Sequence, residues 1–129
     1  MKSAKLGVRE LVASALSAFI IVLIFTCIDF AVHTLSTSFA VESYYFTNKI
    51  IYGTILTFLV LVFVYNYKDS IPKAVFVASI VSVLLQTNYF LLGYPIEFVA
   101  FFLVVHFIIL YAVTYFFFEY LVIKQTIIK

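Results

Sequence analysis

Residues Leu11 to Leu35 read LVASALSAFIIVLIFTCIDFAVHTL, an apolar run in which Asp29 and His33 stand out near the end. A helix needs about 20 apolar residues to cross the hydrocarbon layer of a bilayer, so this run is long enough to span a membrane. An ionisable side chain at mid-bilayer costs about 2.5 to 3.5 kcal/mol on insertion scales. The run therefore predicts a membrane helix that carries a functional polar site.

The composition of the whole chain agrees with a membrane protein. Of its 129 residues, 66% are hydrophobic and 11% are charged, whereas a soluble domain is about 45 to 50% apolar and 25% charged. A soluble fold of this size would expose large apolar patches. We expect residues 1–129 to form one integral membrane unit without a second domain. The single cysteine, Cys27, excludes an internal disulfide and a cysteine-cluster metal site.

Four segments are long enough to cross the bilayer, and we expect them at about residues 8–38, 49–65, 72–92 and 96–123. In lipid only a helix or a closed barrel satisfies the backbone, and runs without alternating polarity do not make a barrel. The predicted fold is an all-α membrane protein, a four-transmembrane-helix bundle.

Two turn motifs separate the later segments. Asp69-Ser70-Ile71-Pro72 offers a capping side chain and a proline that a first helical turn tolerates. Gly93-Tyr94-Pro95 supplies a left-handed cap and a residue that cannot continue the preceding helix. The third and fourth segments should therefore form a tight antiparallel hairpin.

Basic residues predict the orientation. They lie before the first segment, around the second loop and after the fourth segment, and Lys49 lies at the edge of the first loop: Lys2, Lys5, Arg9, Lys49, Lys68, Lys73, Lys124, Lys129. The positive-inside rule then places both termini in the cytoplasm, in a multi-pass protein of the cell membrane. The first apolar run is too long for a cleaved signal peptide. The net charge of +2 argues against a surface that binds nucleic acid. The lipid bilayer is the expected partner.

Polar residues of all four segments fall at similar depths. Counted from the outer helix ends, most of them lie about 10 to 15 Å deep, and His33 lies about 8 Å deep. Asp29 and His33 are four positions apart, on one helix face. We expect a polar pocket lined by Asp29, His33, Gln86, His106, Thr54 and Thr57.

Each of these residues has a structural alternative. Asp29 is a proton or cation site, a metal ligand, or a neutral acid that links two helices. His33 and His106 are either functional partners of Asp29 or histidines satisfied within the structure. Gln86 is expected to join two helices through a hydrogen bond.

The first hypothesis for function is proton- or cation-linked binding or transport at Asp29, His33 and His106. Four spans enclose little lumen, so a homo-oligomer or a larger membrane complex is expected. In size, span number and one acid in the first segment, the chain resembles the small multidrug resistance transporters. It departs from them because Asp29 lies in the outer half, tryptophan is absent and glycine is scarce.

Two other hypotheses remain open. Asp29, His33 and His106 supply a carboxylate and two imidazoles, a set that binds transition metals. This Asp-x-x-x-His order with a second histidine on another helix resembles the copper site of the membrane subunit of particulate methane and ammonia monooxygenases, although the spacing differs. Haem is disfavoured because the histidines differ in depth by about 6 Å. The third hypothesis is an accessory or structural subunit of a membrane complex, and without a catalytic motif an enzyme is not favoured.

Overall fold

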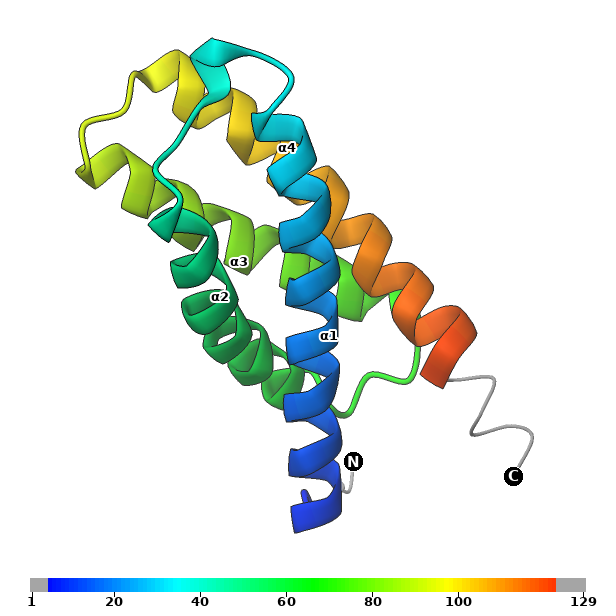
Figure 1. Cartoon of the computed structure of the whole chain (residues 1–129). Coiled ribbons are helices and arrows are strands. Elements are labelled where there is room, and N and C mark those ends of the chain that lie inside the picture. The colour runs from blue at the N-terminus through cyan, green and yellow to red at the C-terminus, as the bar shows by residue number, and fades with distance from the viewer. Residues whose placement is uncertain (1–4, 123–129) are drawn as a thin grey trace.

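The computed structural model describes residues 5–122, and four long helices make up most of them (Figure 1). These are α1 (Val8–His33), α2 (Tyr44–Phe63), α3 (Ser70–Leu91) and α4 (Ile96–Phe116), with a short 3-10 turn η1 (Thr37–Phe39) and a π-helical turn η2 (Phe117–Val122). No strand occurs within residues 5–122. All four helices, the last counted to Leu121, are long and apolar enough to cross a membrane. The predicted all-α fold with four membrane-length helices is confirmed.

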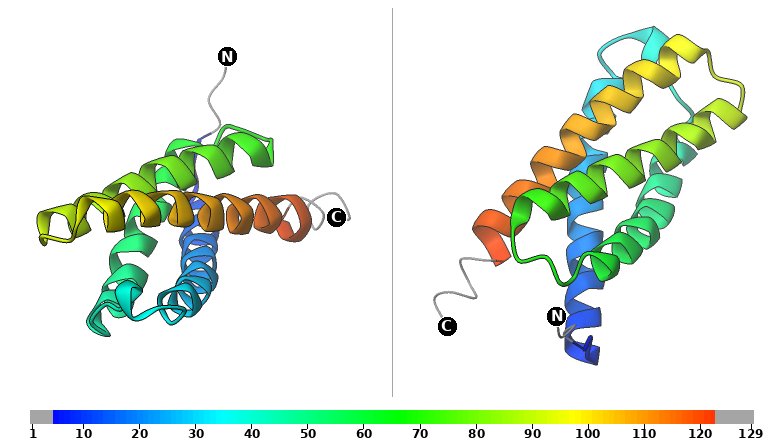
Figure 2. Two further views of the ribbon diagram at one scale, coloured as in Figure 1. Left: turned by 90° about the horizontal axis from the view of Figure 1, so that it is seen from above. Right: turned by 180° about the vertical axis from the view of Figure 1, so that it is seen from behind.

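The helices form two antiparallel pairs. α1 packs on α2, and α3 packs most extensively on α4, while α4 also contacts α1 and α3 also contacts α2. Seen from above, the α3–α4 pair lies as a layer across the α1–α2 pair (Figure 2). The η1 segment and the α3–α4 turn share one end of the bundle, which we call the η1 end (Figure 1).

The turn between α3 and α4 has the predicted chemistry. Gly93 has a φ of 90°, in the left-handed region that favours glycine. The N–H of Tyr94 donates to the carbonyl of Tyr89 at 3.3 Å, and Pro95 immediately precedes α4. At the start of α3, by contrast, the Asp69 side chain makes no capping hydrogen bond.

The helix ends differ from the predicted ones in two places that matter for the site. α1 ends at His33, because η1 and an extended segment replace the predicted helix to residue 38. α2 begins at Tyr44, five residues before the predicted start. Lys49 therefore lies inside a membrane-length helix. The π-helical turn ends the described part of the fourth segment at Val122, and residue 123 lies outside the described residues.

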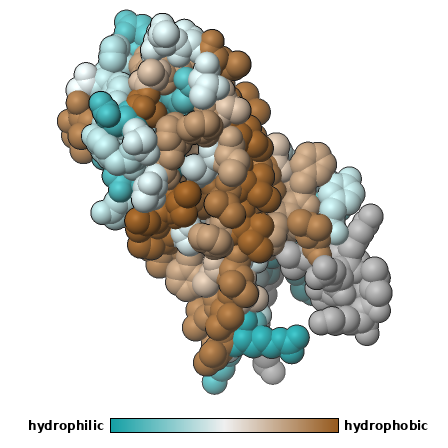
Figure 3. All heavy atoms as spheres, viewed as in Figure 1, coloured by the Kyte–Doolittle hydropathy of each residue, from teal (hydrophilic) through white to brown (hydrophobic). Residues whose placement is uncertain are grey.

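Large apolar side chains cover the outside of the bundle. Leu16, Ile55, Leu84 and Ile108 are examples from the four helices, and each is exposed. Figure 3 shows hydrophobic residues along the middle of the molecule and hydrophilic ones gathered at the η1 end. Such a continuous apolar surface is expected of a protein that faces lipid.

Candidate functional site

Asp29 is fully buried on α1, one helical turn before the helix ends. Its Oδ1 accepts a hydrogen bond from Nε2 of His106 on α4 at 2.9 Å. Its Oδ2 accepts a hydrogen bond from Nζ of Lys49 on α2. Nε2 of His33 lies 3.4 Å from the same oxygen. Three helices thus place titratable groups on one carboxylate.

Lys49 is the residue that the sequence analysis did not place in the site. Only 3% of its surface is exposed, so its ammonium does not extend to the membrane surface. Nζ lies 3.5 Å from Nε2 of His33 and 3.5 Å from Nε2 of His106. The ring of Tyr89 lies 5.2 Å from Nζ and adds a cation–π contact. The ammonium is therefore held among three ionisable side chains and an aromatic ring.

The position of His33 is fixed by the end of α1. Its Nδ1–H donates to the carbonyl oxygen of Phe39 at 2.5 Å, across the η1 turn. Its ring stacks on Phe102 with centroids 4.2 Å apart and an interplanar angle of 4°. Because Nδ1 carries the proton, Nε2 of the neutral ring faces Lys49 and Asp29 with its lone pair. A second proton on Nε2 would be 3.4 Å from Oδ2 of Asp29.

His106 is fully buried and uses both ring nitrogens. The amide of Gln86 on α3 donates to Nδ1 at 2.6 Å, and Nε2–H donates to Asp29. This neutral tautomer satisfies every polar atom of the ring. Phe25 packs edge-on at a centroid distance of 5.2 Å. Gln86 thus completes a site to which all four helices contribute.

We call Asp29, His33, Lys49, Gln86 and His106 the Asp29 cluster. With both histidines neutral, it holds one negative and one positive charge and is neutral overall. A buried ion pair is tolerated when further hydrogen bonds satisfy its members, as they do here. Hydrogen bonds join Asp29 to Lys49 and to His106, and contacts of this kind can carry a proton from one side chain to another.

Thr54 and Thr57 are not part of the cluster. Thr57 lies on the stripe of α2 that carries Lys49, but two turns further along, at about 12 Å. The hydroxyl oxygens of both threonines are buried and have no hydrogen-bond partner among the described residues. The structure therefore brings together the predicted Asp29, His33, Gln86 and His106, and it adds Lys49 in place of the threonines.

The sequence did contain a signal for Lys49. It is the one lysine or arginine that the charge pattern does not assign to the predicted cytoplasmic side. A carboxylate buried in a membrane helix calls for a partner of opposite charge. If the second helix is extended back to Tyr44, Lys49 falls on the same stripe as Gly53 and Thr57, the face that α2 buries.

Asp29, His33 and His106 are also candidate ligands for a metal ion or haem. One ligand atom from each of Asp29, His33 and His106 lies within 4.8 Å of the others, and the donor set suits a transition metal. However, Nζ of Lys49 bonds to Asp29 and lies 3.5 Å from both histidines. Ligand distances of about 2.0 to 2.2 Å would require the ammonium to leave. With Lys49 in this position the cluster does not fit a metal, and the same ammonium contacts both Nε2 atoms that a haem iron would need.

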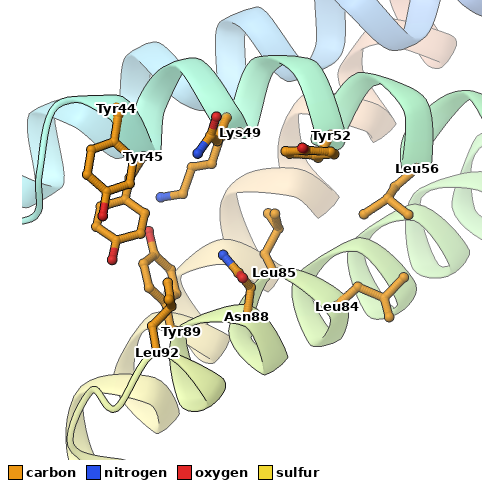
Figure 4. A pocket seen from close by; sticks show the side chains of 11 residues that line it. Tyr44, Tyr45, Lys49, Tyr52, Leu56, Leu84, Leu85, Asn88, Tyr89 and Leu92 are labelled. Atoms are coloured by element: carbon orange, nitrogen blue, oxygen red, sulfur yellow. The ribbon is translucent and has the colours of Figure 1, made fainter.

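Two hollows adjoin the cluster. A groove of about 440 Å³ lies between α2 and α3 and reaches Lys49 (Figure 4). Its lining is Tyr44, Tyr45, Asn48, Lys49, Tyr52, Leu56, Leu84, Leu85, Asn88, Tyr89 and Leu92. We call it the α2–α3 groove, and Lys49 is the one cluster residue that lines it. The second hollow, of about 310 Å³, lies beside the η1 segment and is lined in part by His33.

The Asp29 cluster and its two hollows lie toward the η1 end of the bundle, within membrane-length helices. Comparison with protein-family models, with curated proteins and with solved structures finds no match to this chain. A function is therefore inferred from the chemistry of the Asp29 cluster.

Proposed function

We propose that this chain is a multi-pass protein of the cell membrane that takes up protons at the Asp29 cluster and couples them to the binding or transport of a small solute. One observation carries the proposal: a fully buried carboxylate on α1 is held by a lysine from α2 and a histidine from α4. Intramembrane carboxylates with titratable neighbours are the groups that proton relays use.

The second hollow supplies a route for the proton. His33 lines the hollow beside η1 on one side, and its Nε2 lies 3.4 Å from Oδ2 of Asp29 on the other. A proton that enters at the η1 end binds to the free Nε2 of His33. The imidazolium then gives this proton to Oδ2 of Asp29, and His33 returns to its neutral form with Nδ1–H still bonded to the Phe39 carbonyl.

The proposal includes an orientation and an assembly. Both termini lie in the cytoplasm, so the η1 end faces the outside and protons enter from there. Four helices enclose little space for a solute path. The transporting form is therefore a homo-oligomer or part of a larger membrane complex.

Proton movement in liposomes tests this function. Purified protein is reconstituted with a pH-sensitive dye inside, and a proton gradient is imposed with potassium and valinomycin to balance charge. The wild type is expected to dissipate the gradient, and Asp29→Asn is expected to abolish this because an amide cannot carry the proton. Glu42→Gln is the matched control, since Glu42 is an exposed acid before α2 and its loss should leave the flux unchanged.

Two results would contradict the proposal. Either the Asp29→Asn protein moves protons as fast as the wild type, or wild-type liposomes hold the gradient as well as empty ones do. In both cases the cluster serves only to fix the packing of the helices.

A further inference from the structure

The α2–α3 groove meets the Asp29 cluster at its positive member. Lys49 lines the groove, whereas Asp29, His33 and His106 do not. In Figure 4 the Lys49 side chain extends from α2 toward Tyr45 and Tyr89. A molecule in the groove therefore meets the lysine first, and the carboxylate of Asp29 lies behind it.

A second observation is a buried polar group without a partner on a residue that lines the groove. The side chain of Tyr89 is 2% exposed, and its hydroxyl has no hydrogen-bond partner among the described residues. A buried polar group without a partner costs free energy, so it is usually satisfied by a water or a ligand. Figure 4 shows Tyr89 on the wall of the groove near Lys49, and Asn88 on the same helix.

The size and lining define the body of the ligand. A volume of about 440 Å³ is within the range of small-molecule sites, about 300 to 1,000 Å³. Tyrosine rings and leucines make most of the wall, and Tyr89, Asn48 and Asn88 supply hydrogen-bonding groups. Such a wall suits a compact apolar or aromatic body with one polar end.

The charge of the cluster indicates which charge the polar end of the ligand carries. The cluster is neutral while Asp29 and Lys49 are both ionised, and a net charge in a buried site is costly. A bound cation would add a positive charge, and it would have to pass the ammonium to reach Asp29. A bound monoanion reaches the ammonium directly, and one proton taken up with it keeps the site neutral.

We propose that the α2–α3 groove binds an organic monoanion, a carboxylate with a compact apolar body, and that each anion bound is accompanied by one proton taken up at Asp29. This inference rests on the proposed function, and it names the substrate class for the same site. Proton and anion then favour each other's binding, as reciprocal linkage requires.

The exchange balances in atoms and charge. A proton from solution binds to Oδ2 of Asp29, and the hydrogen bond from Nζ of Lys49 to that oxygen breaks. The ammonium keeps its protons and donates to a carboxylate oxygen of the ligand instead. The Tyr89 hydroxyl donates to the ligand as well. The site gains one proton and one monoanion and stays neutral.

The titratable groups around Asp29 come from all four helices. They are His33 from α1, Lys49 from α2, Tyr89 from α3 and His106 from α4. The phenol of Tyr89 serves as a donor. His33 can pass a proton on through its free Nε2, whereas His106 already uses both ring nitrogens. Protonation of Asp29 is the step that releases Lys49.

Calorimetry in lipid nanodiscs tests the inference, with empty nanodiscs as the blank. The probes are 3-phenylpropionate, a water-soluble carboxylate, and 3-phenylpropan-1-ol, its neutral analogue. We expect the carboxylate to bind with uptake of about one proton, read from titrations in buffers of different ionisation enthalpy. The affinity for the carboxylate should fall about tenfold for each unit of pH, once the pH is above the range in which Asp29 of the ligand-free protein is protonated. The alcohol should bind more weakly and without proton uptake.

Two variants locate the site, and each has a control variant. Lys49→Met should weaken carboxylate binding about 10- to 100-fold, because a charge-assisted hydrogen bond is lost, and leave the alcohol unaffected. Lys73→Met is its control, because Lys73 lies over the ring of Phe118 and should leave both ligands unaffected. Tyr89→Phe removes only the unpartnered hydroxyl and should weaken carboxylate binding about 2- to 10-fold with the fold intact. Tyr111→Phe, outside the groove lining, should change nothing.

A competition arm identifies the source of the ligand. If laurate binds at a lower concentration than 3-phenylpropionate and displaces it, the ligand is a membrane fatty acid. If 3-phenylpropionate binds at the lower concentration, the ligand is a soluble aromatic acid. Equal affinity for carboxylate and alcohol, carboxylate binding without proton uptake, or an unchanged Tyr89→Phe affinity would overturn the inference. Proton flux that depends on Asp29 without carboxylate binding overturns this inference alone. Carboxylate binding with proton uptake but without such flux keeps this inference and overturns the transport part of the proposed function.

Discussion

Lys49 keeps the surroundings of Asp29 neutral in a place that is closed off from water. Removing one member of a buried ion pair leaves the other charge without compensation, which costs about 3 to 5 kcal/mol, whereas removing both members leaves no charge behind. The histidines cannot replace the lysine while neutral, because His106 already uses both nitrogens. The pair therefore governs stability as well as proton uptake.

A double-mutant cycle measures this coupling. Asp29→Asn and Lys49→Met should each lower the free energy of unfolding by about 3 to 5 kcal/mol, and the double variant should lose clearly less than the sum. Reversible unfolding in mixed micelles provides the values. Glu97→Gln with Lys49→Met is the control pair and should be additive, because Glu97 is exposed at the start of α4. Additive losses for Asp29 and Lys49 would show that they do not interact.

Sequence reasoning identified the members of the cluster that stand out in apolar surroundings. Asp29, His33, Gln86 and His106 interrupt apolar helices, and such residues need an explanation wherever they occur. Lys49 was missed because a lysine near the edge of a segment is expected to extend its ammonium to the membrane surface. The charge pattern alone cannot distinguish such a lysine from one that turns inward to an acid.

At the scale of the helices, α1 and α2 approach each other closely at Gly53. A Cβ atom on Gly53 would lie 3.1 Å from Cγ1 of Val22 on α1. Small residues at such contacts let membrane helices pack closely. This contact lies one turn from Lys49 on the same stripe of α2, so it sets the distance that Lys49 spans to Asp29.

Enlarging Gly53 should push the two helices apart. Gly53→Leu is expected to lower the free energy of unfolding by about 1 to 3 kcal/mol through overpacking. It should also slow the Asp29-dependent proton flux, because Lys49 moves away from Asp29. Ala100→Leu adds similar bulk at an exposed position of α4 and should leave both unfolding and flux unchanged. Equal behaviour of the two variants would mean that the α1–α2 contact does not position the site.

The helices were predictable, but their relative levels were not. Hydropathy and turn residues such as Gly93 located four helices, because each must satisfy its own backbone in lipid. Counting residues from the helix ends placed His33 and His106 about 6 Å apart in depth. In the structure both lie 3.5 Å from the same Nζ. The count assumed level helix ends, whereas α1 ends at His33 and the two helix pairs cross.

At the scale of the whole molecule, the exposed apolar surface and the positions of the basic residues suit one orientation in the membrane. The η1 segment would face the outside and the α2–α3 connection the cytoplasm. Labelling of single cysteines in right-side-out vesicles tests this, in a Cys27→Ser background. An impermeant maleimide should label Thr37→Cys in intact vesicles, and Asn66→Cys only after lysis. The opposite pattern would reverse the topology and the direction of proton entry.

The central claim is that Lys49 turns inward to Asp29 within the membrane. Solid-state NMR on protein in lipid bilayers tests it directly, by measuring the dipolar coupling between the lysine ¹⁵Nζ and the aspartate ¹³Cγ, with Lys49→Met and Asp29→Asn samples assigning the signal. The account predicts a coupling that corresponds to a hydrogen-bonded pair and that is lost in either variant. The absence of this coupling in the wild type, with the Lys49 ammonium in contact with lipid headgroups or water, would contradict it.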